Sequence, residues 1–255
     1  MNKDNRQFVL ITGGSSGIGF SLASKFAADG YGIVLAASNE TRLESAKQKL
    51  QESFRVPVWI YALDLAEQGA AQKLYDIIKA DGIQIDALVN NAGIGTIGAA
   101  ETIPVSKDEK LMVLNMITPV TLTKLFLREM YERKAGKILN VCSTGAFQPG
   151  PYTASYYASK SFLLSYTKAV RYEAKQHGVL VCALCPGTTD TGFFKRAESV
   201  TPKGAMSAEK VADYAYRQFM RGKEVIIPGV SYRLMKLFPE KIKTAVIALV
   251  KRQKL

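Results

Sequence analysis

The chain has 255 residues, 47% of them apolar, which is enough for one large buried core, and no internal repeat or low-complexity linker divides it. No apolar run approaches the length of a membrane span, and the run that follows the charged N-terminus is too short for a secretory signal, so we expect a cytoplasmic protein. The net charge is +12, but no nucleic-acid-binding motif accompanies it, so we expect no nucleic-acid partner.

A strand, a glycine-rich turn and a helix open the chain. Phe8 to Ile11 is β-branched and aromatic, the turn covers 12–19, and an amphipathic pattern runs from Phe20 to Asp29. Glycines in this context let the backbone approach a pyrophosphate, whose charge is met by the helix N-terminus. The pattern predicts a dinucleotide site, and a plain tight turn is the alternative. The expected cofactor contacts are Gly13, Ser15, Ser16, Gly17, Ile18 and Gly19.

The second predicted strand, Ile33 to Ala37, bears on the choice of cofactor. It leads into Ser38-Asn39 and a helix over 40–53. An acidic residue at this strand end would bind the 2′-hydroxyl of NAD and repel the 2′-phosphate of NADP. No acidic residue stands there, so NADP(H) is favoured over NAD(H), with Ser38, Asn39 and also Arg42 as candidates to hold the phosphate.

Two more strands follow, over 58–62 and 87–90, with a helix over 67–80 between them. Asn91, Ala92 and Gly93 come directly after the fourth strand. Small residues there would let the backbone pass close to a cofactor, and asparagine side chains can tie neighbouring strands together. We expect cofactor contacts from these three residues, with simple turn chemistry as the alternative.

One long helix is predicted over 106–133, with an interruption around Pro119. Asn115 lies inside it among apolar neighbours and needs a polar partner, because an unpaired buried amide is costly. A kink at the proline would free backbone groups and admit a water. A fifth strand, 137–141, would deliver Ser143 at its carboxyl end, where open α/β sheets place ligands.

Tyr156 and Lys160 are four residues apart, so on a helix they share a face. A free tyrosine has a pKa of about 10, and a fixed cation beside it favours the phenolate. The pair suits general acid–base chemistry on an alcohol or carbonyl, although the same spacing also occurs on solvated helix faces. Tyr152 and Tyr157 lie nearby, but neither stands four residues before Lys160.

The last part of the chain holds two further strands, a possible lid and a basic extension. The sixth strand ends at Pro186-Gly187, the segment 192–206 is a candidate mobile lid over an apolar substrate, and 224–228 is the seventh strand. Residues 231–255 contain seven Lys or Arg and one Glu, in a pattern of two amphipathic helices. This extension could cap the substrate cleft, form an oligomer contact or touch a membrane surface, in that order.

Two other features carry no predicted chemistry. Cys182 and Cys185 spell CxxC inside an apolar strand, where residues three apart face opposite sides, so we interpret both as buried apolar residues and expect no metal site. The sole histidine, His177, lies at a predicted helix end and is interpreted as structural, which excludes a nucleophilic triad.

Together these motifs resemble the short-chain dehydrogenase/reductase family. The similarity rests on the turn 12–19 with GxxxGxG spacing, and it extends in matching order from Phe8 to about Pro228. The family's NADP-preferring members often carry basic residues where Ser16 and Ser38 stand, and both are missing here. The other residues that carry the resemblance are Asn90, Asn91, Ala92, Gly93, Asn115, Ser143, Tyr156, Lys160, Pro186 and Gly187.

The resemblance implies a single-domain α/β Rossmann fold over 1–230, with a doubly wound parallel sheet of seven strands in the order 3-2-1-4-5-6-7, and with 231–255 as its helical extension. It implies an oxidoreductase in which Tyr156 exchanges the proton with substrate, Ser143 polarises the carbonyl, Lys160 lowers the tyrosine pKa and holds the ribose, and Asn115 positions a relay water. Further cofactor contacts would come from Asp64, Leu65, Tyr156, Lys160, Pro186, Gly187, Thr189 and Thr191.

The same resemblance implies a homodimer or homotetramer. A ketone or its secondary alcohol would be the substrate, and the basic extension tilts the expectation toward lipid-like or acyl-carrier-bound molecules. A non-catalytic dinucleotide-binding scaffold or redox sensor is the alternative, which the complete set of four catalytic residues disfavours. A sugar-nucleotide epimerase is disfavoured by the short chain and the glycine spacing.

Overall fold

The computed structural model describes residues 6–193, 197, 202, 204–235 and 238–252. At its centre lies a seven-stranded sheet in which every neighbouring pair is parallel. The predicted strand order is confirmed, since β9 is the seventh strand of this sheet in chain order. From edge to edge the strands are β3 (Val58–Ala62), β2 (Gly32–Ala37), β1 (Phe8–Thr12), β4 (Ala87–Asn90), β5 (Gly136–Val141), β6 (Val179–Leu184) and β9 (Val225–Ile226).

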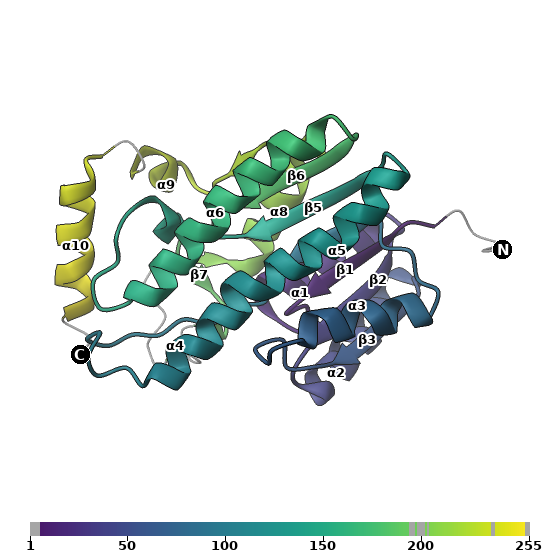
Figure 1. Ribbon diagram of the computed structural model, residues 1–255, viewed down its shortest axis with the longest axis horizontal. Helices are drawn as coiled ribbons and strands as arrows, with labels where there is room; N and C mark the ends of the chain where they lie inside the picture. The colour runs from purple at the N-terminus through teal and green to yellow at the C-terminus, as the bar shows by residue number, and fades with distance from the viewer. Residues whose placement is uncertain (1–5, 194–196, 198–201, 203, 236–237, 253–255) are drawn as a thin grey trace.

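Helices cover both faces of the sheet, as the doubly wound pattern predicts. On one face lie α1 (Gly17–Ala28), α2 (Glu40–Phe54) and α8 (Ala208–Met220). On the other face, in front of the sheet in Figure 1, lie α3 (Ala70–Ala80), α5 (Thr118–Glu132) and α6 (Ala154–Lys175). The inner strands β1, β2, β4 and β6 are buried on both sides, which is why they read as continuous apolar runs, whereas the edge strand β3 has exposed residues.

The side chains of β1 alternate between two cores. Val9 and Ile11 join the cluster under α1, α2 and α8, whereas Leu10 joins the cluster under α3, α5 and α6. Phe26 of α1 is fully buried in the first cluster, with edge-to-face ring contacts to Tyr31 and other aromatic residues.

The predicted interruption of the long helix is present. α4 (Val105–Met112) passes into a π-helical turn, η1 (Val113–Ile117), before α5 begins at Thr118. Pro119, at the start of α5, lacks the N–H that would bond the carbonyl of Asn115, so the regular helix cannot continue through this point. By length and composition the stretch Val105–Glu132 would pass as a membrane span, although no such run was expected; 56% of its most apolar window is buried inside the fold, as in a core helix.

A second, two-stranded ladder was not predicted. β7 (Thr189–Asp190) pairs with β8 (Met206–Ser207), so both ends of the predicted lid over 192–206 are held together. Each strand has only two residues, too few for an alternating pattern to mark them in the sequence. Most of the lid between them, including Phe194, lies outside the described residues.

The cysteines and the histidine have structural environments. Cys182 and Cys185 belong to different apolar clusters, as the strand geometry predicts, and burial raises the pKa of Cys182 to about 11. A hydrogen bond with Cys142 and burial raise the pKa of Cys185. His177 stacks on Tyr131 with ring centroids 4.0 Å apart. Within the described residues no cluster of three or more His, Cys, Asp and Glu is placed to hold a metal.

The basic extension forms two helices, α9 (Val230–Met235) and α10 (Glu240–Arg252). In Figure 1 α10 stands at the end of the molecule toward which the strands point. This is the end where an open α/β sheet binds its ligands.

Candidate active site

A cavity of about 690 Å³ lies at the carboxyl ends of the strands. It extends from the glycine turn after β1 to α10. The following sequence-predicted residues line it: Gly13, Ser15, Ser16, Gly17, Ile18, Ser38, Asn39, Asp64, Leu65, Asn91, Ala92, Gly93, Ser143, Tyr156, Lys160, Pro186, Gly187, Thr189 and Thr191. Gly19 and Asn115 do not line it. The structure therefore brings nearly all of the predicted residues to one cavity.

The glycine turn is shaped by close packing. Gly13 has a φ of 63°, and a Cβ there would lie 2.9 Å from Asn91 Nδ2. Gly17 has a φ of 56°, and a Cβ there would come within 3.0 Å of Thr191. Ser16 is the N-cap of α1 but makes no side-chain capping bond. The first N–H groups of α1 therefore remain available to an anion, as a pyrophosphate site requires.

Gly19 serves packing. A Cβ at this position would lie 2.4 Å from the carbonyl oxygen of Gly13 and 2.5 Å from Asn91 Nδ2. The absence of a side chain lets α1 approach the turn and the end of β4. The residue thus shapes the cavity from behind its wall.

Thr12 and Asn91 clasp the ends of β1 and β4. The Thr12 hydroxyl oxygen accepts bonds from the backbone N–H groups of Asn91 and Ala92, both at 3.0 Å. Asn91 Nδ2 donates to the carbonyl of Thr12 at 2.9 Å and to that of Gly13 at 3.1 Å. One residue earlier, Asn90 Nδ2 donates to Asn140 Oδ1 at 2.9 Å, so the expectation that these amides tie strands together is confirmed.

At the end of β2, the cavity is lined by Ser38, Asn39 and Arg42. Asn39 is the N-cap of α2, and its Oδ1 accepts from the backbone N–H of Arg42 at 2.8 Å. Asp64 is the only carboxylate among the described residues that line the cavity, and its Oδ1 accepts from Ala66 N at 3.0 Å. This bond closes a turn and does not cap α3, whose N-cap is Gly69, and the second oxygen of Asp64 keeps acceptor capacity for a ligand.

Ser143, Tyr156 and Lys160 meet where β5 ends against α6. Ser143 follows β5, its Oγ accepts from Gly145 N at 3.0 Å, and its hydroxyl is hydrogen-bonded to that of Tyr156. Lys160 lies one helical turn after Tyr156, with its Nζ 5.8 Å from the centre of the tyrosine ring. That Nζ donates to the carbonyl of Val141 at 2.9 Å. Two hydroxyls and one ammonium thus line the same stretch of wall.

Burial is the largest influence on the pKa values of Tyr156 and Lys160. Burial raises the pKa of Tyr156 above its ordinary value, while the hydrogen bond with Ser143 lowers it. Burial also lowers the pKa of the Lys160 ammonium. The chain alone removes more solvation from the phenolate than nearby groups return, so a lowered tyrosine pKa would need the charge of a bound nicotinamide in addition to that of Lys160.

Asn115 sits behind the wall and holds the loop that follows β4. Its Nδ2 donates to the carbonyl of Ile94 at 2.9 Å and to Ser159 Oγ at 3.1 Å, and its Oδ1 accepts from Ile94 N at 3.1 Å. The buried amide therefore has the partners that its apolar neighbours cannot supply. A Cβ on Gly93 would lie 3.1 Å from Asn115 Oδ1 and 3.3 Å from Lys160 Nζ, so these residues are close neighbours.

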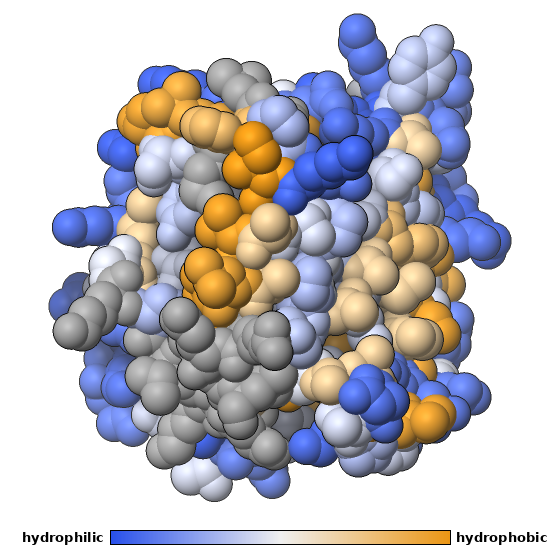
Figure 2. Space-filling model, turned by 90° about the vertical axis from the view of Figure 1, so that its left-hand side faces the viewer, coloured by the Kyte–Doolittle hydropathy of each residue, from blue (hydrophilic) through white to orange (hydrophobic). Residues whose placement is uncertain are grey.

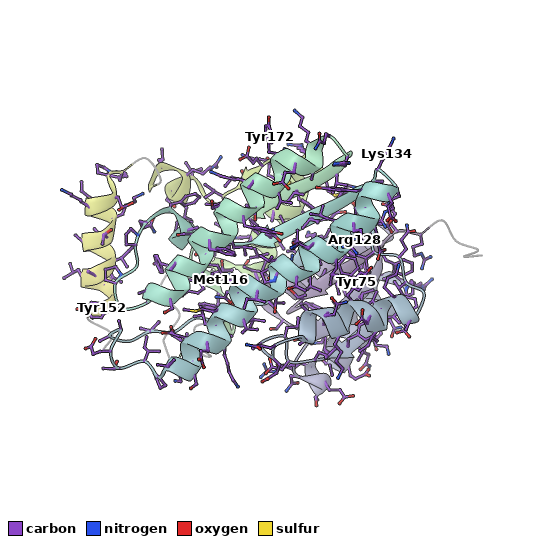
Figure 3. All side chains as sticks on the ribbon, in the orientation of Figure 1. Tyr75, Met116, Arg128, Lys134, Tyr152 and Tyr172 are labelled. Atoms are coloured by element: carbon purple, nitrogen blue, oxygen red, sulfur yellow. The ribbon has the colours of Figure 1, made fainter. Side chains whose placement is uncertain are left out.

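Tyr156 and Tyr157 have different surroundings. The ring of Tyr156 faces Phe193, with centroids 5.3 Å apart. The ring of Tyr157 is held against Gly145 and Gly150, where a Cβ on Gly150 would approach it to 2.3 Å. Tyr152 adopts a left-handed φ of 61° on the side of the molecule that carries α10 (Figure 3), and it does not line the cavity.

The C-terminal extension contributes residues that the motifs did not identify. Val246, Ile247 and Val250 of α10 line the cavity, and Lys243 Nζ donates to the carbonyl of Phe147 at 3.1 Å. These contacts agree with the first of the three predicted functions of the extension, a cap over the cleft. The amphipathic period of α10 was visible in the sequence, but the surface that it covers was not.

α9 contacts the segment that follows β6. The hydroxyl of Tyr232 accepts from the backbone N–H of Thr188 at 3.1 Å, and its ring leaves no room for a side chain at Gly187, where a Cβ would lie 2.2 Å away. The extension therefore holds the Pro186–Thr191 wall of the cavity in place.

Fold and cavity together define an α/β protein in which a glycine turn of the dinucleotide-binding type shares one cavity with Ser143, Tyr156 and Lys160. The family model of the short chain dehydrogenases matches residues 7–201. The chain belongs to this family of oxidoreductases.

Solved structures and curated relatives agree with this assignment. A short-chain dehydrogenase from Sphingobium yanoikuyae in complex with NADPH is 28% identical, with a TM-score of 0.85 over 95% of each chain. The bulky-bulky ketone specific alcohol dehydrogenase from Comamonas testosteroni is also 28% identical, with a TM-score of 0.80 over 96% of this chain and 95% of that one. The very-long-chain 3-oxoacyl-CoA reductase of Bos taurus is 31% identical over 71% of this chain and 58% of its own length. The chain spans about three fifths of the length of several curated relatives that it matches.

The Tyr232 contact generates a prediction about stability. Tyr232→Phe keeps the ring on Gly187 but removes the acceptor of the Thr188 N–H, which costs roughly 1–2 kcal/mol. For a chain of this size the melting temperature should fall by about 2–8 °C in a thermal unfolding scan. Tyr172→Phe is the matched control, because Tyr172 on α6 is 87% exposed (Figure 3). Equal melting temperatures for both variants and wild type would contradict a stabilising bond.

Proposed function

We propose that this protein is an NAD(P)(H)-dependent oxidoreductase that reduces a ketone or oxidises the matching secondary alcohol. The observation that carries the proposal is that Ser143, Tyr156 and Lys160 line the same cavity as the glycine turn. A carbonyl oxygen placed beside the two hydroxyls would therefore lie within the dinucleotide site. The names of the relatives, which include a ketone-specific alcohol dehydrogenase and a 3-oxoacyl-CoA reductase, support the same chemistry.

Each residue of the group has a distinct function in this proposal. Tyr156 gives its proton to the carbonyl oxygen in reduction and takes it back in oxidation. Ser143 donates a hydrogen bond to the same oxygen and stabilises the charge that develops on it. Lys160 favours the phenolate through its charge, and the N–H groups not used by Val141 can bind ribose hydroxyls. A bound nicotinamide would supply the hydride acceptor or donor and, when oxidised, a positive charge.

Asn115 would position the water that carries protons between Lys160 and solvent. Its side chain is engaged by Ile94 and Ser159, so we assign the water to its backbone carbonyl. That carbonyl cannot receive the usual helical bond from residue 119, because Pro119 has no N–H. The π-helical turn around Asn115 supports this assignment.

The cofactor would be NADP(H) in preference to NAD(H). Ser38, Asn39 and Arg42 line the adenosine end of the cavity, and α2 presents its N-terminus there, which suits a phosphate. Two neighbours at 28% identity, from Sphingobium yanoikuyae and from a metagenome, are named as complexes with NADPH and NADP. Arg42 would supply the positive charge that Ser16 and Ser38 lack.

The substrate would be an apolar, lipid-like or acyl-carrier-bound ketone. Phe193 and three aliphatic residues of α10 line the cavity beyond Tyr156. We further propose a homodimer or homotetramer through the helices that carry Asn115 and Tyr156. These helices expose Met112, Ile117 and Phe162, at 46%, 53% and 41% of their surface.

Replacing the acid–base group tests the proposal. Tyr156→Phe should abolish NADPH oxidation across a panel of 3-oxoacyl thioesters, steroid ketones and xenobiotic ketones, with nucleotide binding unchanged in a fluorescence titration. Tyr157→Phe is the control and should retain turnover, since its hydroxyl has no function in the reaction. A Tyr156→Phe enzyme that still turns over, or a wild type that binds NADPH and reduces nothing, would overturn the proposal.

The pKa of Tyr156 predicts a pH dependence. Alcohol oxidation needs the phenolate, so kcat/KM should rise with pH through a raised pKa. Ser143→Ala removes the interaction that lowers this pKa, so the rising limb should move to higher pH. The kcat of the variant should also fall by roughly 10²–10³-fold, as it does when a hydrogen-bond donor to an oxyanion is removed.

The control for Ser143 is Ser161→Ala, which removes a hydroxyl bonded to the Ala146 carbonyl on the same helix as Tyr156. Its pH profile should match that of wild type. If the rising limb of the kcat/KM profile of Ser143→Ala stays in place or moves to lower pH, the Ser143 hydrogen bond does not lower the pKa of Tyr156.

Arg42 tests the choice of cofactor. Arg42→Ala should raise KM for NADPH by about tenfold or more, because a charged hydrogen bond contributes roughly 1.5–3 kcal/mol, and should leave KM for NADH nearly unchanged. Lys47→Ala is the matched control, a cation on the same helix that pairs with Glu44 and does not line the cavity. Wild-type preference for NADH, or equal losses with both cofactors, would contradict the assignment.

A further inference from the structure

Exposed apolar side chains are concentrated on the C-terminal extension. Of the fourteen large apolar side chains that are exposed in the described part of the chain, seven lie between 230 and 250. Phe238, Ile242 and Leu249 are 56%, 53% and 63% exposed. Figure 2 faces α10 and shows apolar surface running down it, with hydrophilic surface beside it. A soluble surface rarely gathers apolar residues so densely without a partner.

The apolar arc of α10 is wider than the cavity wall that it forms. Val246, Ile247 and Val250 line the cavity. Ile242 and Leu249 do not line it, yet at 100° per residue they lie next to Val246 on the helix surface. The apolar surface therefore continues without a break from inside the cavity to the outside of the molecule. Capping the cleft explains one part of this arc and leaves Ile242 and Leu249 unexplained.

The charge of the extension indicates what covers this surface. Residues 231–255 carry seven Lys or Arg and only Glu240 as an acid, which is half of the excess positive charge of the chain. Among the described side chains of α9 and α10, Arg233, Lys241 and Lys243 are cations and Glu240 is the one acid. A two-fold contact through this face would therefore bring like charges together, which opposes it. An anionic bilayer suits both the exposed apolar surface and the positive charge of the extension, because its interface accepts apolar side chains and its surface attracts Lys and Arg.

We propose that α9 and α10 form a docking surface for an anionic lipid bilayer, and that an apolar ketone dissolved in the bilayer enters the cavity past α10. The docking is independent of catalysis. The entry route rests on the oxidoreductase function proposed above. In this arrangement Ile242 and Leu249 enter the interface, while Val246 and Val250 line the path from lipid to Tyr156.

Vesicle binding tests the docking. The full chain is floated with vesicles of phosphatidylglycerol and phosphatidylcholine, and with vesicles of phosphatidylcholine alone. Wild type should bind the anionic vesicles and lose affinity as salt is raised. The double variant Ile242→Ser/Leu249→Ser should bind these vesicles at least roughly tenfold more weakly than wild type, since two apolar side chains no longer enter lipid. Tyr172→Ser removes an exposed apolar residue elsewhere and should bind as wild type.

Turnover tests the entry route. The double variant should reduce a water-soluble ketone at the wild-type rate, because neither residue lines the cavity, and should lose activity on a ketone dissolved in anionic vesicles in proportion to lost binding. Equal activity of both enzymes on the vesicle-dissolved ketone would overturn the route. If no ketone is reduced by wild type, the oxidoreductase proposal fails while the flotation result still decides the docking.

Three outcomes would overturn the docking itself. One is a wild type that floats with neither vesicle, and another is a double variant that floats like wild type. The third is a wild type that self-associates through this face, seen in sedimentation velocity as a dimer that the double variant loses, without vesicle binding. Binding to an acidic acyl carrier protein in place of vesicles would likewise overturn the docking, since it assigns the surface to a protein partner.

Discussion

The buried ammonium of Lys160 is the constraint on which the rest of the site depends. A cation removed from water must be paired or hydrogen-bonded, and the partner here is the Val141 carbonyl at the end of β5, 2.9 Å away. That contact sets α6 against the carboxyl edge of the sheet, which brings Tyr156 beside Ser143. Gly93 and Asn115 complete the surroundings, because a side chain at residue 93 would meet both Asn115 Oδ1 and Lys160 Nζ. Burial lowers the pKa of this lysine and raises that of the tyrosine, so the fold by itself favours the neutral form of both groups.

The same edge of the sheet joins the acid–base group to the dinucleotide site. Thr12 and Asn91 lock β1 to β4 through bonds of 2.9 to 3.1 Å, and Asn90 continues the tie to β5 through Asn140. Ser143 follows β5 directly. The glycine turn and Ser143 are therefore attached to strands whose positions are fixed by side-chain amides as well as by the backbone ladder. A displacement of one strand end would move both sites, and the buried amides that prevent it are tolerated because they are hydrogen-bonded to one another.

Much of this arrangement could be predicted from the sequence. The strand order, the helices, the break before Pro119 and the opposite directions of Cys182 and Cys185 follow from local patterns and from a family resemblance that covers most of the chain. Contacts that depend on tertiary proximity could not be predicted. The spacing of Tyr156 and Lys160 indicated a cation beside the phenol, but it could not show that burial in the assembled core raises the tyrosine pKa in the chain without cofactor. The glycine spacing predicted a cofactor contact at Gly19, but the close packing of this residue on Gly13 and Asn91 could not be predicted from it. The pairing of β7 with β8 involves two residues on each side, too few to leave a pattern.

The C-terminal extension shows most clearly how a pattern can predict an element without predicting its contacts. The period of α10 marks an amphipathic helix, and any of three partners would satisfy it. The fold resolves part of this choice, because α10 lines the cavity with Val246, Ile247 and Val250 and is anchored by Lys243 to Phe147. α9 meanwhile holds Thr188 through Tyr232, on the wall that includes the predicted cofactor contacts Pro186, Gly187, Thr189 and Thr191. Whatever binds the outer side of these helices therefore acts on elements that also shape the cavity. An interaction at the surface of the extension can change the site without passing through the sheet, since only one layer of helix separates the two.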